Sequence, residues 1–367
     1  MNNKKARVIA FYLPQFYPIP ENDKWWGKGF TEWTNVGKAK PLFKGHYQPK
    51  VPSDLGYYDL RVPEVREQQA QMAKDAGIEG FCYWHYWFGN GKRLLDRPFN
   101  EVLASGKPDF PFCLGWANHS WANKTWNSDN QYLKSKLLIE QQYIGEDDYC
   151  NHFMYALTAF KDNRYIRIDG NPVFYIYDPL NFKDVKLFIS LWQQKAKDNG
   201  LNGIFFIGQA FLNNDCKRIL DLGFNGVARV GIYDAVEKIN GKAIDIIKRK
   251  FKKYFRFLML QKYDYADIVD NLINPNLDKL EMIYPIIVPN FDHSPRSGKS
   301  GLIYQNSTPE LFKKLLERTL HAIETKKDDH KIIFLRSWNE WGEGNYVEPD
   351  LKYGHGYLNA IKEVICQ

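Results

Sequence analysis

The sequence predicts an α/β protein that folds as one (β/α)8 barrel over residues 1–367. Three observations predict this fold. Eight short segments rich in β-branched and aromatic residues alternate with longer segments of helical pattern. Polar side chains follow each short segment, as expected where parallel strands end. The first predicted strand leads into Leu13-Pro14-Gln15-Phe16, which lacks the glycine loop of an open, dinucleotide-binding sheet.

The eight predicted strands are short, and each one runs into a loop with polar residues. Their ranges are 8–13, 80–86, 110–116, 173–177, 203–207, 226–230, 283–288 and 331–338. The loops carry, in order, Gln15, His85, Asn118, Asp178, Gln209, Asp234, Asn290 with Asp292, and Asn339 with Glu340. Because the active residues of a barrel lie in loops at the carboxyl ends of its strands, we expect the site there.

Helical segments fill the stretches between the predicted strands. Several begin near Pro or Asp, and Gly77 and Gly200 follow two of them as C-terminal stops. The predicted helices cover 63–76, 147–160, 184–198, 309–325 and 353–364. Alternating strands and helices imply parallel strands joined by right-handed crossovers, and eight such strands close into a barrel.

The composition is that of a globular protein. With 44% hydrophobic and 25% charged residues in a chain of 367, it can bury a large core, which excludes disordered and fibrous classes. No window approaches the ~18 apolar residues of a membrane-spanning helix, and the first residues lack a signal-peptide core. The five cysteines are widely spaced and odd in number, which favours reduced thiols. We therefore expect a cytoplasmic protein.

A basic helical insertion is predicted after the sixth strand, over residues 237–275. The chain has 50 basic and 43 acidic residues, a formal net charge of +7. Nine Lys or Arg residues lie between Lys238 and Lys262, interleaved with apolar residues and with one acid, Asp245. Two interpretations stay open. We favour the solvated face of a helix packed on the core; the other is contact with an anionic membrane surface, peripheral to the inner membrane, or with a phosphate-bearing ligand.

The segment 337–349, directly after the last predicted strand, contains the strongest candidates for catalytic residues. Glu340 and Glu343 are three residues apart, so on a turn or short helix their side chains point to the same side. Trp338 and Trp341 can exclude water and raise the pKa of one carboxyl, while its neighbour opposes a second charge. The result is an acid and a base, as in glycosidic-bond chemistry, with carboxyl groups about 5–5.5 Å apart in retaining enzymes. A salt-bridged pair on a surface turn is the alternative.

Side chains suited to carbohydrate gather at the same end of the predicted barrel. Of the 11 tryptophans, all but Trp192 fall at strand ends or in the loops after strands one, two, three and eight. Segments 83–88 and 116–121 combine flat rings with hydrogen-bonding groups. Strand alternation sends half of these side chains under the helices, so core packing is an equal alternative for each ring. His85 and Asn118 are the stronger candidates, because both stand where a strand should end.

We expect no metal and no cofactor. The eight histidines show no H-E-x-x-H spacing. Ser297-Gly298-Lys299-Ser300 is similar to the end of a phosphate-binding loop, but His293 stands where that loop needs its first glycine. The Asp-x-Asp triplet of many nucleotide-sugar transferases is absent from the sequence, which weakens an ordinary transferase of that type.

Four motifs stand in order along the chain: FYLPQF at 11–16, WWGKGFTEWTN at 25–35, GFCYWHYWF at 80–88 and WNEWGEG at 338–344. They resemble the WbsX-type family, named as glycosyltransferases of O-antigen and other surface-polysaccharide clusters. That family is similar in turn to the endo-α-mannosidase family of glycoside hydrolases. The likeness covers nearly the whole chain. His119, Phe291 and His293 depart from the family pattern, which bears on the substrate pocket and the sugar.

The resemblance implies a (β/α)8 barrel and roles for two residues. Glu340 would deprotonate the sugar 2-hydroxyl, which attacks its own anomeric carbon, and Glu343 would protonate the departing oxygen and then activate water or an acceptor. This route retains configuration; retention through a glutamate nucleophile is the nearby alternative. The substrate-binding residues that we predict are Tyr12, Gln15, Trp26, Glu32, Trp33, Tyr83, His85, Trp87, Trp116, Asn118, Asp292, Trp338 and Asn339.

We therefore predict a carbohydrate-active enzyme that cleaves or transfers a glycosyl unit in the biosynthesis of O-antigen, lipopolysaccharide or another surface polysaccharide. Its expected partner is an oligosaccharide or lipid-linked glycan, with no nucleic acid. The alternative is a glycan-binding protein of a polysaccharide assembly cluster that keeps the aromatic cleft without turnover. Hydrolase and transferase stay undecided, because they differ only in whether water or a sugar hydroxyl is admitted.

Overall fold

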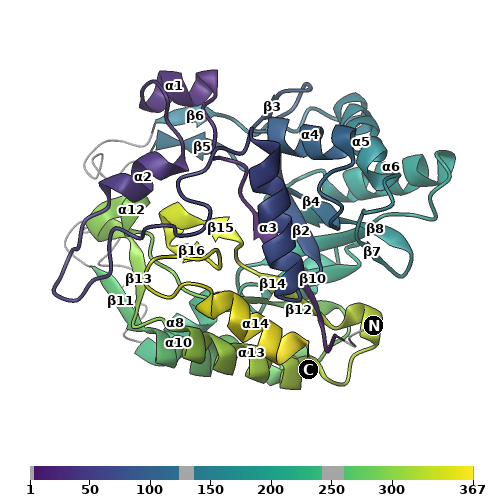
Figure 1. Cartoon of the computed structure of the whole chain (residues 1–367). Helices are drawn as coiled ribbons and strands as arrows, with labels where there is room; N and C mark the ends of the chain where they lie inside the picture. The colour runs from purple at the N-terminus through teal and green to yellow at the C-terminus, as the bar shows by residue number, and fades with distance from the viewer. Residues whose placement is uncertain (1–3, 124–135, 242–259, 367) are drawn as a thin grey trace.

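Eight parallel strands close into a barrel in the computed structural model, which describes residues 4–123, 136–241 and 260–366 (Figure 1). The first strand pairs with both the second and the last, which closes the ring. In order around the barrel the strands are β1 (Arg7–Tyr12), β2 (Gly80–Trp87), β4 (Phe112–Trp116), β8 (Asn171–Ile176), β9 (Phe205–Ala210), β10 (Gly226–Arg229), β12 (Ile283–Ile287) and β14 (Ile332–Leu335). The predicted (β/α)8 barrel is confirmed.

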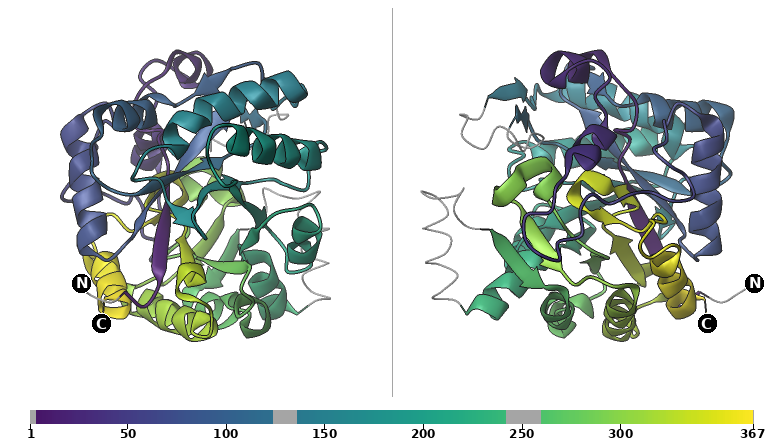
Figure 2. Two further views of the ribbon diagram at one scale, coloured as in Figure 1. Left: turned by 90° about the vertical axis from the view of Figure 1, so that its right-hand side faces the viewer. Right: turned by 60° about the vertical axis from the view of Figure 1, so that its left-hand side comes forward.

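Helices follow the barrel strands and cover the outside of the barrel (Figures 1 and 2). They are α3 (Pro63–Asp75), α4 (Arg97–Ser105), α5 (Glu146–Phe160), α6 (Val185–Asp198), α7 (Asp215–Leu220), α8 (Ile232–Asn240), α10 (Tyr265–Leu272), α13 (Pro309–Ile323) and α14 (Gly356–Ile365). Each predicted helix agrees with an observed one to within three residues at either end.

Short additional elements extend the loops between the barrel strands and helices. The helical ones are α1 (Pro20–Trp26), α2 (Glu32–Lys38), α11 (Pro275–Asp278), α12 (Ser294–Ser297), η3 (Gly298–Ser300), η4 (Asp328–His330) and η5 (Trp341–Glu343). The strands are β3 (Arg93–Leu94), β5 (Trp121–Ala122), β6 (Leu137–Ile139), β7 (Arg167–Ile168), β11 (Gln261–Asp264), β13 (Leu302–Gln305), β15 (Asn339–Glu340) and β16 (Asn345–Tyr346). Figure 1 shows α1, α2, β5 and β6 at the end of the barrel away from both chain termini.

The two ends of the chain meet at the amino end of the barrel. The backbone N–H of Lys5 donates a hydrogen bond of 3.0 Å to the carbonyl of Ile365. Figure 2 shows the termini together, opposite α1. Since β1 starts at Arg7 beside them, the carboxyl ends of the strands lie at the far end of the barrel.

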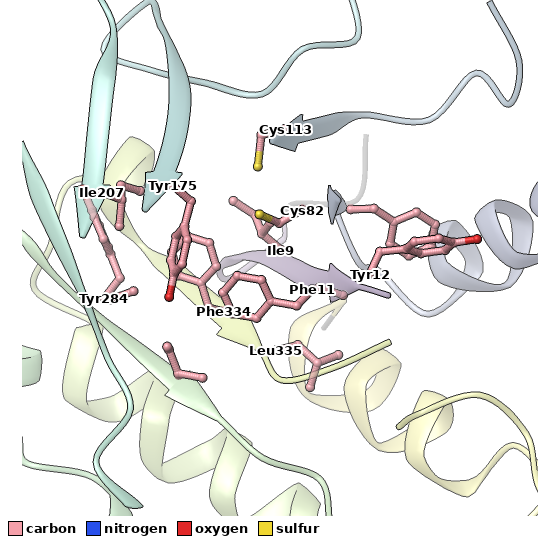
Figure 3. Packing of buried hydrophobic residues seen from close by; sticks show 14 of the residues in the cluster. Ile9, Phe11, Tyr12, Cys82, Cys113, Tyr175, Ile207, Tyr284, Phe334 and Leu335 are labelled. Atoms are coloured by element: carbon pink, nitrogen blue, oxygen red, sulfur yellow. The ribbon is translucent and has the colours of Figure 1, made fainter. Parts of the chain in front are cut away.

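An aromatic layer fills the barrel interior and fixes which residues of each strand point inward. The Phe11 ring stacks on Trp84 with centroids 4.7 Å apart and lies 4.9 Å from Tyr175 and 5.4 Å from Phe334. Figure 3 shows Phe11, Tyr175 and Phe334 facing one another, whereas Tyr12 points away from them. Because side chains alternate along a strand, every second residue is inside the barrel and its neighbours lie under the helices.

The predicted basic insertion over 237–275 is described only at its two ends. Its central part, 242–259, lies outside the described residues, so its helical structure and its membrane contact stay predictions. The flanks consist of the end of α8 on one side and of β11 and α10 on the other. In the part of the chain that the structure describes, no helix combines the length and apolar character needed to cross a membrane.

Candidate active site

A cavity of about 130 Å³ opens at the carboxyl ends of the barrel strands, above the aromatic layer. Phe11 and Trp84 of that layer form its floor. Tyr86 and Trp121 add two further rings, packed edge to face at 5.0 Å. The other lining residues are Leu13, Ala117, His119, Tyr177, Gln209, Arg296, Arg336, Ser337, Glu340 and Glu343. Flat rings with a few convergent polar groups are typical of a small-molecule site.

The loop after β14 brings both glutamates to this cavity. Ser337 organises the turn, because its hydroxyl accepts a hydrogen bond from the backbone N–H of Glu340 at 2.8 Å and donates one to the carbonyl of Asn345 at 2.9 Å. Glu340 ends β15, and Glu343 ends the single turn of η5. The two carboxyl groups line the same cavity and do not face apart.

Two arginines neutralise Glu343. Its carboxylate accepts hydrogen bonds from Nη1 of Arg296 at 2.5 Å and from Nη2 of Arg336 at 3.3 Å. Nε of Arg296 also donates to Oε1 of Glu32 at 2.9 Å, so this guanidinium is shared between two acids. Glu340 is 4.0 Å from Nη2 of Arg296, too far for a hydrogen bond. Glu343 therefore accepts hydrogen bonds from arginine and Glu340 does not.

The two carboxyl groups consequently differ in protonation. Burial raises the pKa of Glu340 to about 8; the charge of Glu343 and a hydrogen bond between the two groups act in the same direction, while both arginines offset part of the shift. Burial also acts to raise the pKa of Glu343, but Arg296, His293 and Arg336 hold it well below its ordinary value. At neutral pH Glu340 keeps its proton and Glu343 is ionised, as in other coupled carboxyl pairs.

Gly342 leaves space for the carboxylate of Glu32, which binds Arg296 behind the two glutamates. A Cβ atom at this position would lie 1.5 Å from Oε1 of Glu32 and 3.0 Å from Nε of Arg296. We expect Gly342→Ala to lower the free energy of unfolding by about 1–3 kcal/mol, because the buried ion pair must shift. Urea unfolding of the variant measures this loss.

Gly37→Ala is the matched control for that substitution. Gly37 lies in α2, and a Cβ added there meets nothing within 4 Å. Since alanine favours a helix over glycine by up to about 1 kcal/mol, we expect unchanged or higher stability. Equal effects of the two substitutions would contradict the role of Gly342.

Buried hydrogen bonds anchor the loop that carries the pair. The side chain of Asn339 accepts from the backbone N–H of Leu13 at 2.7 Å and donates to the carbonyl of Leu13 at 3.1 Å. Nε1 of Trp341 donates to Glu348 at 2.6 Å, and the backbone N–H of Asp292 donates to the carbonyl of Glu343 at 2.6 Å. Three predicted substrate-binding residues, Asn339, Asp292 and Glu32, thus support the pair from behind the cavity wall.

Six other predicted binding residues do not line this cavity, five of them because side chains alternate along a strand. Tyr12, Tyr83, His85, Trp87 and Trp116 are buried on the outward side of their strands and do not line the cavity. Trp338, in the loop between β14 and β15, is also buried outside the cavity and packs 5.2 Å from Phe81. The hydroxyl of Tyr12 donates to Gln69 on α3. His85 and Trp87 pack on His152 of α5, and Nε1 of Trp116 donates to the carbonyl of Trp87. These rings form the packing layer between sheet and helices.

The remaining four predicted binding residues also lie outside the cavity. Asn118 bridges two loops through hydrogen bonds with the backbone N–H and carbonyl of Asp178. Trp33 packs 5.5 Å from Trp341 and donates to the carbonyl of Tyr58. Gln15 is buried, and Trp26 packs against Phe30. The structure thus does not bring them to the pair.

The cavity contains residues outside the predicted set that carry rings or polar groups. They are Phe11, Trp84, Tyr86, His119, Trp121, Tyr177, Gln209, Arg296, Arg336 and Ser337. Counting every second residue of each strand as facing the barrel interior would have found several of them. Phe11, Trp84 and Tyr86 belong to the alternate set of the same strands, one residue away from Tyr12, Tyr83 and His85. Arg296 had no such signal, since α12 lies outside the strand pattern.

The site offers no ligand set for a metal. No group of three or more His, Cys, Asp or Glu side chains that could hold an ion occurs within residues 4–123, 136–241 and 260–366. The two carboxyl groups that meet here are engaged by each other and by arginine.

The fold is that of known glycoside hydrolases. A glycoside hydrolase-like protein superposes with a TM-score of 0.60 at 17% identity, covering 100% of this chain and 96% of its own. A GH99 endo-α-mannosidase from Bacteroides thetaiotaomicron gives a TM-score of 0.57 at 15% identity, covering 97% of this chain and 95% of its own. At these identities the likeness concerns the barrel.

The family described as glycosyltransferase WbsX matches residues 8–361. The chain belongs to this WbsX family. Its relatives include the uncharacterized protein WxcX of two strains of Xanthomonas campestris pv. campestris, each 33% identical over 364 residues, which is 99% of this chain and 50% of the relative. The WbsX chain thus spans about half the length of the curated relatives it matches. Family and fold together support a carbohydrate-active enzyme, as the sequence motifs predict.

Proposed function

We propose that this WbsX chain cleaves or transfers a glycosyl unit, with Glu340 and Glu343 as its catalytic residues. One observation carries the proposal: two buried carboxyl groups share a cavity above an aromatic floor and hold opposite protonation states at neutral pH. Glycosidic-bond chemistry needs one protonated and one ionised carboxyl at the scissile bond.

In the proposed first step, Glu340 gives its proton to the departing glycosidic oxygen as the bond to the anomeric carbon breaks. Ionised Glu343 takes the proton of the sugar 2-hydroxyl, whose oxygen attacks that carbon. Water or an acceptor hydroxyl then attacks the carbon and returns a proton to Glu340, while Glu343 returns the other to the 2-oxygen. Two displacements at one carbon retain configuration. Direct attack by Glu343 is the alternative route.

This division of roles is the reverse of the one implied by the resemblance, which makes Glu340 the base and Glu343 the acid. The contacts favour the reversal. A carboxylate held by Arg296 and Arg336 cannot act as a proton donor until it takes up a proton, and both positive charges oppose that. Glu340 has no direct arginine contact within hydrogen-bond distance and keeps its proton.

The proposed substrate is an oligosaccharide or lipid-linked glycan of O-antigen, lipopolysaccharide or another surface polysaccharide, handled in the cytoplasm. The description of the family as glycosyltransferases supports a role in assembly. The barrel shared with glycoside hydrolases supports attack at an anomeric carbon. Contact of the basic segment with an anionic membrane surface belongs to the same proposal.

The purified chain, incubated with oligosaccharides from the surface polysaccharide of its source organism, tests the proposal. We expect a cleaved or extended glycan, and proton NMR of the first product formed should show the anomer of the substrate. Adding acceptor sugars separates a transferase from a hydrolase. Saturable binding without product across the panel would contradict the proposed enzyme and favour the glycan-binding alternative.

The pH dependence of kcat/KM tests the proposed proton positions. Since the pKa of Glu340 is raised to about 8, its proton-donor form persists at neutral pH and is lost as the pH rises through about 8. The base form of Glu343 persists below the ordinary glutamate range, because its pKa is lowered. We expect a plateau around neutrality and a fall above about pH 8. A rate that rises through this range would make Glu340 the base.

A further inference from the structure

One wall of the cavity presents hydrogen-bond donors rather than acceptors. Arg336 stands at the end of β14, Gln209 near the end of β9 and Tyr177 just after β8, and all three line the cavity. They belong to one neighbourhood, since the charge of Arg336 acts on the hydroxyls of Tyr175 and Tyr177, and Tyr175 contacts Gln209. Donors gathered on one wall call for a ligand group rich in acceptors.

Arg336 has capacity for a further anionic partner. Glu343 is the one hydrogen-bond partner of its guanidinium among the described residues, and that bond is long, at 3.3 Å. The same carboxylate already has a 2.5 Å bond from Arg296. About a quarter of the Arg336 side chain, 24%, is exposed, against 2% for Arg296. Of the two guanidinium groups, Arg336 is the one that a ligand can reach.

Gln209 presents its amide nitrogen for the same purpose. Its Oε1 accepts the hydroxyl of Tyr175 at 2.6 Å, which fixes the orientation of the amide and leaves the NH₂ group to donate. Nε2 is buried and finds no acceptor in the described ranges. A buried donor without an acceptor is costly, so a ligand oxygen at this position is favoured.

The local charges admit an anion. Arg296 and Arg336 carry two positive charges, and Glu32 and Glu343 balance them, so no net negative charge opposes an incoming anion while Glu340 is protonated. A carboxylate or phosphate offers only acceptors and pairs with arginine through two parallel hydrogen bonds. A neutral hydroxyl group would accept fewer hydrogen bonds from these donors and would not pair with the charge of arginine.

We infer that the glycosyl substrate carries an anionic oxygen group, bound by Arg336 and Gln209. The group is either the carboxylate of an acidic sugar or the phosphate of a glycosyl phosphate, and both present the same oxygens to the wall. The inference rests on the proposed function, because it places a glycan in the cavity beside Glu340. It adds the chemical class of that glycan.

Binding measurements test the inference without turnover. The probes are methyl glucuronide and methyl galacturonide, their neutral glucoside and galactoside counterparts, and glucose 1-phosphate. Isothermal titration calorimetry measures each affinity, and a change in tryptophan emission that is lost in Trp84→Phe and Trp121→Phe places the probe in the cavity. We expect at least one anionic probe to bind about tenfold or more tightly than its neutral counterpart. The uronides and the phosphate identify which source of the anionic group the wall accepts. Absence of a saturable response to every anionic probe up to roughly 50 mM overturns the inference.

Two variants locate the preference within the cavity. Arg336→Gln should remove the preference for the anionic probe, and Gln209→Glu, which keeps the acceptor for Tyr175 and adds a negative charge, should reverse it. Arg218→Gln, an exposed arginine on α7, is the control and should leave both affinities unchanged. A preference that survives both cavity variants, or equal binding of charged and neutral probes, overturns the inference. The proposed function fails separately, if Glu340 proves dispensable for turnover.

Discussion

Replacing Glu340 by glutamine is expected to lower turnover of the natural glycan by about 10²–10⁴-fold, because the variant cannot give a proton to the departing oxygen. The fold should persist, since glutamine has nearly the shape of a protonated glutamate and the one arginine contact affected, with Arg296, is long at 4.0 Å. Initial rates on the natural glycan and thermal unfolding of the variant measure the two effects. Glu324→Gln, at an exposed site beyond α13, is the control and should keep full activity.

An activated leaving group separates the two glutamates. A glycosyl fluoride of the same sugar departs with little help from an acid, so Glu340→Gln should lose far less activity on it than on the natural glycan. Glu343→Gln should be impaired on both substrates, because it removes the ionised group that faces the anomeric centre. The opposite pattern would restore the roles implied by the family resemblance. Full activity of both variants would contradict any catalytic role of the pair.

Replacing Arg296 by methionine is expected to lower the free energy of unfolding by about 3–5 kcal/mol. Arg296 is 2% exposed in its side chain and pairs with Glu32, which is completely buried, and with Glu343. Removing one partner of a buried ion pair leaves an uncompensated charge, which is the costly case. Urea unfolding measures the change, provided that the slope m stays constant.

A double-mutant cycle assigns that loss to the ion pair. Glu32→Gln removes the charge that Arg296→Met leaves behind, so the double variant should be more stable than the sum of the two single effects predicts. Arg318→Met is the matched control, because Arg318 is 42% exposed and its pair with Asp270 is at the surface; a change of at most about 1 kcal/mol is expected. Similar losses for Arg296→Met and Arg318→Met would contradict the structural role of Arg296.

The barrel could be predicted because its signals are local. Each strand is a run of β-branched and aromatic residues, and helix boundaries such as Pro63 and Pro309 are marked in the sequence. The place of Glu340 and Glu343 at the barrel opening could be predicted for the same reason, since a short segment shows both their spacing and their position after the last strand. The residues that surround them in the cavity were harder to predict from the sequence.

The main obstacle to predicting the cavity residues was to decide which side chains of each strand point into the barrel. In the segment 83–88 nearly every residue is aromatic, so hydrophobic pattern alone does not distinguish the two faces, and a shift of one residue exchanges them. The role of Arg296 could not be predicted for another reason. Arg296 lies in a four-residue helix and contacts Glu32, which is 264 residues away in the sequence. Contacts of this kind depend on the assembled fold.

The hydrogen bond between Lys5 and Ile365 has a practical consequence for experiments on this chain. It holds both chain ends at the pole of the barrel remote from the cavity, because β1 begins there and runs toward the site. A linker joined at either end would tether the molecule to a bead or sensor chip with its opening toward the bulk solution. The proposed binding of glycans should therefore be the same whichever end is anchored.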